Sequence, residues 1–332
     1  MEYVVIVKAL LIFKGEAMKK LYLLFTLLFL IVLSSCGGAK KTSIVSTSFA
    51  GFDFGRAVAG DLKTSSMLLA PGEELHDYSP SVSDIEKIIS SEIFIYIGGE
   101  SDEQWVEKQI LPEIDENKTK VINMMDVVKN GGFTYNEEEP ASSFSEEEEE
   151  EEEFDEHVWN SITNAKKIIN AICDALVEID KVNEDKYVHN KTNYISKLDK
   201  VDSDIKAITN NSNKKKLVFA DRFPLLYFVK EYNLEYDAAF KGCETAKEAN
   251  PKTIESLINV IKENNIKVLF VIELSESNIA DTIINTCKKD QIELEKRVFY
   301  TMHNLSKDDY EAGKTYVDFM NLNIESLRKA LA

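Results

Sequence analysis

The chain has 332 residues, of which 44% are hydrophobic and 29% are charged. This length predicts two domains or one large α/β domain with insertions, and the composition is that of a globular protein, which excludes a protein that spans the membrane many times. The 39 Lys and Arg residues stand against 58 Asp and Glu residues, so the net charge of −19 argues against phosphate-backbone binding and excludes nucleic acid as the main partner.

The beginning of the chain has the pattern of a secretory signal within residues 1–35. Lys19 and Lys20 precede an almost unbroken apolar run over residues 21–33, which is too short to span a bilayer comfortably as a helix. Residues 1–17 are interpreted as a start-site extension, because Met18 is the more natural first residue of such a signal.

The sequence Leu33-Ser34-Ser35-Cys36 resembles the lipobox of bacterial lipoproteins. By this resemblance Cys36 carries a lipid and becomes the first residue of the mature protein. Residues 36–42 are then a tether that holds the folded part at the extracytoplasmic face of the cytoplasmic membrane. The alternative is an anchoring helix followed by a chance cysteine.

Residues 43–182 alternate short apolar runs with helical patterns, which is typical of βα units and a parallel sheet. We interpret them as an N-terminal α/β lobe. The predicted elements are strands over 43–49, 65–70, 93–98 and 120–125, and helices over 52–60, 84–91, 102–111 and 161–179.

An acidic loop over residues 137–156 interrupts this lobe, with eight consecutive Glu residues at 146–153. Charges of one sign at this density repel one another and stay solvated, so a mobile loop is predicted. Two interpretations remain open for it. It is either a low-affinity antenna for cations or a solvated low-complexity insertion.

Residues 183–213 form the next unit, a predicted long linking helix with apolar residues at three- and four-residue spacing. Residues 214–332 then repeat the strand and helix alternation as a C-terminal α/β lobe. Its predicted elements are strands over 217–220, 238–240, 268–273 and 297–302, and helices over 225–232, 253–265, 278–289 and 308–331. The fold class is therefore α/β, with two lobes of mainly parallel sheet joined by one long helix. Binding sites of such sheets lie beyond the carboxyl ends of the strands, here between the lobes.

Three of the four histidines, His76, His157 and His303, stand at strand ends or in loops. Neutral imidazole is the commonest metal ligand in proteins, and Zn²⁺ takes about four nitrogen, oxygen or sulfur ligands from separate loops. The joint placement of these histidines therefore predicts a metal site. The fourth, His189, lies in the middle of a helix and is interpreted as solvent-facing.

Residues 68–88 contain Pro-Gly followed by Glu-x-His-x-Tyr-x-Pro-x-x-x-Asp around His76, and residues 155–168 begin with Asp-x-His-x-Trp around His157. With the stretches 52–61, 93–108 and 312–331, they resemble the zinc and manganese substrate-binding lipoproteins of bacterial ABC importers. The resemblance covers nearly the whole mature chain. It implies that His76 and His157 are metal ligands of the first lobe, and that the protein is a monomeric receptor which delivers its ion to an ABC permease.

The ligands of the second lobe are less clear, because the family usually offers His or Glu where this chain has Asp221-Arg222. We assign Asp221, since a carboxylate is a credible ligand of Zn²⁺ or Mn²⁺; if Arg222 occupies the matching position, Asp221 is only its ion-pair partner. His303 stands near the place of the family's last ligand. Glu273 is the reserve carboxylate, with helix capping as its alternative role.

The predicted ligand set of His76, His157, Asp221 and His303 contains three imidazoles and one carboxylate. This set suits Zn²⁺ best, whereas Mn²⁺ favours a larger share of oxygen ligands, so zinc is the expected ion and manganese the alternative. A closed coordination sphere holds an ion and does not catalyse hydrolysis, so no enzyme activity is expected.

Two other functions fit parts of the sequence. A zinc hydrolase needs an open coordination position and a general base such as Glu273. An adhesin or scaffold lipoprotein would not need His76. No Gly-rich phosphate loop, nucleophile elbow or His-Glu-x-x-His pattern is present in the sequence.

Of the remaining cysteines, Cys173 lies on an amphipathic helix and is expected to be a buried small hydrophobe. Cys243 and Cys287 both belong to the second lobe. They either form a disulfide in an extracytoplasmic setting or stay unpaired, and the sequence leaves both states open.

Overall fold

The computed structural model describes residues 42–73, 78–142, 154–242, 250–275 and 278–332, which belong to one compact unit. His76, Cys36, Cys243 and the Glu run at 146–153 lie outside the described residues. Within the described ranges, no helix is both long enough and apolar enough to cross a membrane.

The first lobe is built on a four-stranded sheet in which all neighbouring strands are parallel, in the order β2-β1-β3-β4. Its central strands are buried along their whole length, which explains why they are short apolar runs without polar alternation. The strands are β1 (Ile44–Ser46), β2 (Ser65–Met67), β3 (Ile93–Tyr96) and β4 (Lys120–Asn123). The helices are α2 (Phe49–Ala59), α3 (Val82–Ser90), α4 (Glu100–Asp102), which continues as a π-helix (Glu103–Ile110) and a 3₁₀ turn (Leu111–Glu113), α5 (Met124–Lys129), a 3₁₀ turn (Val158–Asn160) and α6 (Ile162–Ile179).

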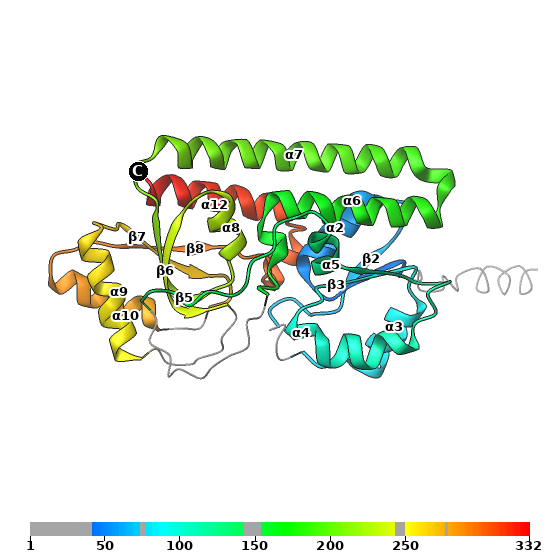
Figure 1. Ribbon diagram of the computed structural model, residues 1–332, viewed down its shortest axis with the longest axis horizontal. Coiled ribbons are helices and arrows are strands. Elements are labelled where there is room, and N and C mark those ends of the chain that lie inside the picture. Colours follow the sequence, from blue (N-terminus) through cyan, green and yellow to red (C-terminus); the bar gives the residue numbers. More distant parts are fainter. Residues whose placement is uncertain (1–41, 74–77, 143–153, 243–249, 276–277) are drawn as a thin grey trace, which may run out of the picture. The chain divides into compact units, whose positions relative to one another are not determined.

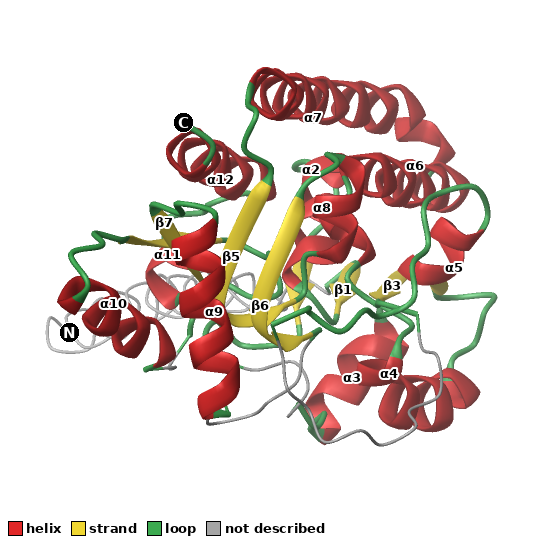
Figure 2. Cartoon of the chain, turned by 60° about the vertical axis from the view of Figure 1, so that its left-hand side comes forward, coloured by secondary structure: helices red, strands yellow, loops and turns green. Residues whose placement is uncertain are grey.

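The second lobe repeats this plan with a parallel sheet in the order β6-β5-β7-β8. Helix α9 lies beside strands β5 and β6 in Figure 2. The strands are β5 (Lys216–Phe223), β6 (Glu235–Lys241), β7 (Val268–Ile272) and β8 (Glu295–Phe299), and the helices are α8 (Leu226–Glu231), α9 (Pro251–Glu263), α10 (Ile279–Lys289), α11 (Lys307–Glu311) and α12 (Tyr316–Ala330).

A 3₁₀ turn (Lys181–Asn183) leads from α6 into the long helix α7 (Glu184–Asn211), which packs against α2 and α6 of the first lobe and against α12 of the second (Figure 1). The face that it buries follows the helical spacing seen in the sequence, with Tyr187, Tyr194, Leu198, Val201 and Ile205. Two parallel sheets with flanking helices and one long connecting helix confirm the predicted fold class.

One hydrophobic core runs through both lobes. It contains Phe54 and Trp159 of the first lobe together with Tyr227, Phe299 and Tyr316 of the second, all of them fully buried. The lobes are therefore joined by shared apolar packing as well as by the long helix.

Asp53, a fully buried residue of α2, joins three helices through its carboxylate. It accepts hydrogen bonds from the hydroxyl of Tyr194 on α7 at 2.5 Å and from the backbone N–H of Tyr316 at the start of α12 at 2.9 Å, and it pairs with Arg56 at 2.7 Å. Arg56 in turn donates to the carbonyl of Lys314 at 2.6 Å, just before α12. Burial first, and the charge of Asp53 second, raise the pKa of Tyr194 well above its ordinary value, so this hydroxyl stays a donor.

The C-terminal region differs from the single helix predicted over 308–331. It is divided into α11 and α12, because Gly313 adopts φ +69° and Thr315 begins a new helix with a capping box to Asp318. Strand β8 also ends at Phe299 instead of residue 302, because the backbone N–H and carbonyl of Tyr300 are bonded to the Asn323 side chain on α12.

The beginning of the acidic loop lies against the second lobe. Glu138 pairs with Lys230 at 2.7 Å, Glu139 pairs with Lys241 at 3.4 Å, and the Ser142 hydroxyl donates to the carbonyl of Ala238 at 2.8 Å. This part of the loop thus connects the first lobe to the outer strand β6. Among the described cysteines, Cys173 is buried as expected, and Cys287 is buried and free.

Candidate metal centre

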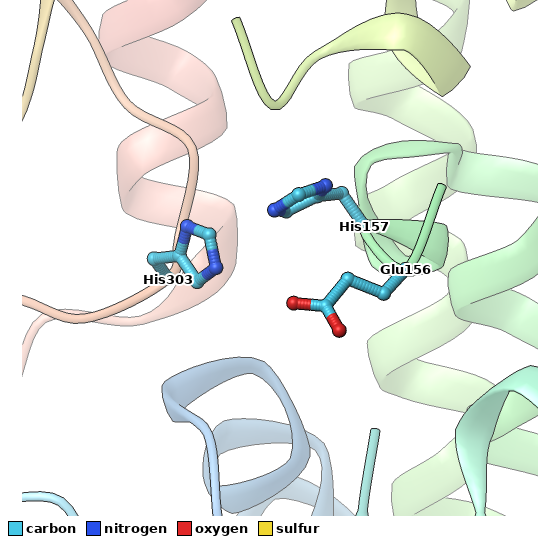
Figure 3. A group of neighbouring side chains, drawn as sticks. All are labelled: Glu156, His157 and His303. Carbon is cyan, nitrogen blue, oxygen red and sulfur yellow. The ribbon is translucent and has the colours of Figure 1, made fainter. Parts of the chain in front are cut away.

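Glu156, His157 and His303 form the group of possible metal ligands that the structure brings together within its described ranges. Each offers one ligand atom, and these atoms lie within 4.8 Å of one another. Figure 3 shows the three side chains pointing toward one another from two separate segments of the chain. All three are buried, with exposed fractions of 5%, 0% and 6%, respectively. Two imidazoles and a carboxylate converging without solvent are the usual components of a transition-metal site.

His157 is held by the carboxylate of the residue two positions before it. Asp155 accepts hydrogen bonds at 2.8 Å from both the backbone N–H and the Nδ1–H of His157. A carboxylate on Nδ1 makes Nε2 the nitrogen that could bind a metal, which is the arrangement found behind ligating histidines. The backbone carbonyl of Asp155 is itself anchored by the hydroxyl of Tyr227 at 2.8 Å.

Glu156 is held by the beginning of α4. One carboxylate oxygen accepts the backbone N–H of Ser101 at 3.1 Å, and the other accepts the Ser101 hydroxyl. Gly99, directly before α4, allows this close approach, because a Cβ at that position would lie 2.5 Å from Cβ of Glu156 and would also collide with Oε2. The carboxylate is therefore held in place from one side, while its opposite side faces the histidines (Figure 3).

We predict that Gly99→Ala weakens zinc binding about 10- to 100-fold, the usual effect of disturbing the groups behind a metal ligand. The added methyl displaces Glu156 and disturbs its hydrogen bonds to Ser101. Calorimetric titration of Zn²⁺ measures the affinity. Gly313→Ala is the control, because no atom lies within 4 Å of the added Cβ, and its φ of +69° makes this substitution more strained than that of Gly99, whose φ is −104°. Equal affinities of the Gly99 variant and the wild type would contradict this prediction.

His303 lies in the loop that follows β8, and a partly buried carboxylate fixes the start of this loop. Glu273 accepts the backbone N–H and the hydroxyl of Thr301, each at 2.7 Å. The His303 ring is 4.7 Å from the His157 ring, centroid to centroid, with an interplanar angle of 85°. The Trp159 ring contacts both imidazoles at 5.4 and 5.3 Å, so the two histidines share one aromatic wall.

Asp102 is a second buried acid near this centre. Its Oδ2 accepts the backbone N–H groups of Ile97 at 2.6 Å and Gly98 at 3.2 Å. Burial, followed by the negative charge of Glu156, raises the pKa of Asp102 to about 7. A cation bound next to Glu156 would offset the repulsion between the carboxylates of Asp102 and Glu156.

Because the pKa of Asp102 is raised on folding, its ionisation opposes the folded state. The contribution of Asp102 to stability is fully present below the ordinary aspartate pKa of 3.8 and is lost as the pH rises toward 7, by up to about 1.4 kcal/mol per pH unit. We predict that Asp102→Asn removes this fall in metal-free protein. Urea denaturation at pH 4, 5.5 and 7 measures it against the wild type, with the exposed Asp61→Asn as control. Parallel pH profiles of all three proteins would contradict the prediction.

The sequence-predicted residues fall into three groups. His157 and His303 lie together, while His76 is outside the described residues. Asp221 is buried, and its carboxylate accepts the backbone N–H groups of Arg222 at 2.9 Å and Ile272 at 3.4 Å; burial raises its pKa. It does not belong to the group of Glu156, His157 and His303, and its role as a ligand stays a prediction.

Glu273 was the alternative carboxylate ligand, with helix capping as its other predicted role. Its carboxylate accepts two hydrogen bonds from Thr301, so it supports the His303 loop. Glu156 was not considered from the sequence. The sequence did contain a sign of this role, because Glu156 stands between Asp155 and His157 in the Asp-x-His-x-Trp motif.

Comparison with known proteins gives one family model, described as zinc-uptake complex component A, periplasmic, which matches residues 44–330. The zinc-binding lipoprotein AdcA of Streptococcus pneumoniae is 28% identical over 318 residues, covering 94% of this chain and 61% of AdcA. The chain therefore spans about three fifths of the length of that relative. The high-affinity zinc uptake system protein ZnuA of Bacillus subtilis is 28% identical over 316 residues, covering 91% of this chain and 94% of ZnuA.

Solved structures show the same fold. The Zn(II)-bound ZnuA-like domain of Streptococcus pneumoniae AdcA has a TM-score of 0.67 and 25% identity, covering 88% of this chain and 99% of that domain. The metal-dependent lipoprotein YcdH of Bacillus subtilis has a TM-score of 0.69 at 24% identity, with coverages of 88% and 99%. An Mn-bound periplasmic metal-binding protein from Candidatus Liberibacter asiaticus has a TM-score of 0.68 at 22% identity, covering 88% of this chain and 100% of that chain. The last two show likeness of fold alone.

Proposed function

Because the chain belongs to the family of the periplasmic component A of zinc-uptake complexes, we propose that it is an extracytoplasmic receptor which binds Zn²⁺ and delivers it to an ABC permease for import. Glu156, His157 and His303 are its proposed ligands in the described residues. His76 is the proposed fourth ligand, on the motif that the sequence shares with such receptors.

The convergence of these three side chains is the observation that supports this proposal most. Two imidazole nitrogens and one carboxylate oxygen suit Zn²⁺, which binds nitrogen at about 2.0–2.1 Å and carboxylate oxygen at about 2.0–2.2 Å in tetrahedral sites. His76 would complete four ligands with three imidazoles. Mn²⁺ is the alternative ion, but it favours more oxygen ligands than this set offers.

A component of an uptake complex is a binding protein and not an enzyme. Four protein ligands would leave no position for a reactive water, which agrees with that role. A zinc hydrolase is therefore not retained as an alternative, and the adhesin reading has no observation in its favour.

The proposed location is the outer face of the cytoplasmic membrane. Relatives named as zinc-binding lipoproteins support it, as does the lipobox-like sequence that ends at Cys36. We propose that a lipid on Cys36 anchors a monomer there.

Elemental analysis of the purified protein, followed by competitive titration with Zn²⁺ and Mn²⁺, tests the function. We expect one tightly bound zinc per chain and a weaker affinity for manganese. Protein that binds neither ion with one-to-one stoichiometry would refute the receptor role, and a preference for Mn²⁺ would refute the choice of ion.

A further inference from the structure

The loop that carries His303 begins on the second lobe. The backbone N–H of Tyr300 donates to Oδ1 of Asn323 on α12, and the Asn323 amide donates back to the carbonyl of Tyr300, both at 2.7 Å. The next residue, Thr301, is bound to Glu273 at the end of β7 through its N–H and its hydroxyl. Up to this point the loop is therefore fixed to the second lobe.

The carbonyls of Thr301 and His303 accept hydrogen bonds from the first lobe, while the backbone N–H of His303 is bonded to Glu273 of the second lobe. The indole N–H of Trp159 donates to the carbonyl of Thr301 at 2.9 Å, and the backbone N–H of Phe49 donates to the carbonyl of His303 at 3.4 Å. Met302, between these two anchors, has φ +57°, a conformation that persists only where the surroundings fix it. His303 thus follows a strand of the second lobe and is hydrogen-bonded to both lobes, through its N–H to the second and through its carbonyl to the first.

Asn304 makes the last of these contacts, and it is 4% exposed. Its side-chain amide donates to two carbonyls of the first-lobe turn after β2, that of Ala70 at 2.9 Å and that of Glu73 at 2.6 Å. Its Oδ1 accepts the backbone N–H of Leu305 at 2.8 Å. Both donors and the acceptor of this side chain are therefore in use, next to a proposed ligand.

We propose that Asn304 is a positioning residue for metal binding, which fixes His303 to the first lobe so that His303 stays beside His157 and Glu156. This inference rests on the proposed function. It assigns no contact with the ion to Asn304. The hydrogen bonds of Asn304 to the first lobe limit the movement of the His303 loop, so their loss is expected to shorten the time for which the ion is retained.

Asn304→Asp tests this role with little change in shape. An aspartate keeps the acceptor for the Leu305 N–H but loses both donors, and its charge faces two carbonyl oxygens. We expect Zn²⁺ to dissociate about 10- to 100-fold faster, the usual effect of removing support behind a ligand. Stopped-flow transfer of zinc to a chromophoric chelator measures the rate, and the visible absorption of Co²⁺-loaded protein, which reports ligand geometry, is expected to change as well.

Asn211→Asp is the matched control. This exposed asparagine at the end of α7 also donates its amide to a backbone carbonyl, that of Ala207 at 2.7 Å, and the substitution adds the same charge. We expect a wild-type dissociation rate and a wild-type Co²⁺ spectrum. Asn304→Ala, which lacks the donors without adding charge, repeats the test if the aspartate variant does not fold.

An unchanged dissociation rate together with an unchanged Co²⁺ spectrum would overturn the positioning role. Slower dissociation would overturn it too, since that is the effect of an added negative charge alone. If the wild type binds no zinc, the proposed function fails; if the wild type binds zinc and the Asn304 variants match it, only this inference fails.

Discussion

His157→Ala is expected to weaken zinc binding by more than about 100-fold. Loss of a group behind a ligand costs up to that factor, and this substitution removes the ligand itself. His157 is the fully buried member of the group, and its ring is already oriented by Asp155. The substitution also leaves the Asp155 carboxylate facing a cavity. Competition against a zinc chelator of known affinity measures the loss.

His189→Ala is the control for this prediction. His189 lies on α7, and its ring nitrogen contacts the side chain of Asn193 in an exposed position away from the proposed ligands. We expect its zinc affinity to equal that of the wild type. If the two histidine variants bind zinc equally well, His157 is not a ligand.

Asp53→Asn is expected to lower the free energy of unfolding by about 1–3 kcal/mol, the range for leaving a buried hydrogen-bonding group without its partner. Tyr194 and Tyr316 both donate to Oδ2, so the single oxygen of asparagine can serve both, but its NH2 group then faces the Nε–H donor of Arg56. The substitution also removes the negative charge from the N-terminus of α12. Urea denaturation of metal-free protein measures the change.

Asp61→Asn serves as the control for Asp53, because Asp61 is exposed and lies only two residues beyond α2. Surface substitutions of this kind change stability by about 0.5 kcal/mol or less. A similarly small effect at Asp53 would show that its three hydrogen-bonded partners contribute little to folding.

The strands and most helices could be predicted because burial and sequence pattern agree. Residues 93–96 and 268–272 are apolar runs, and both became central strands covered on two faces. The long helix followed from its apolar spacing, and most of its buried residues are those that the spacing indicated. The fold class therefore depended on local patterns that are visible in one sequence.

The structure differs from the sequence-based predictions where backbone conformation or contacts between distant residues decide the outcome. The bonds between Asn323 and Tyr300 accompany the end of a strand, and the positive φ at Gly313 divides a helix; a periodic pattern carries no signal for the first of these. Glu156 became a candidate because Ser101, 55 residues earlier, holds its carboxylate. Asp221 was assigned from its position in the chain; its oxygens bind backbone N–H groups, and its role as a ligand stays a prediction.

The core shared by Phe54, Trp159, Phe299 and Tyr316 has a consequence for calorimetry and for protein engineering. Cutting the chain between the two sheets would leave each half with large aromatic rings in water, at about 25 cal/mol for every Å² exposed. The halves should therefore melt in a single cooperative transition, and neither should be recoverable as a soluble fragment. Hybrid receptors made by exchanging one sheet would need matching aromatic residues from both parents.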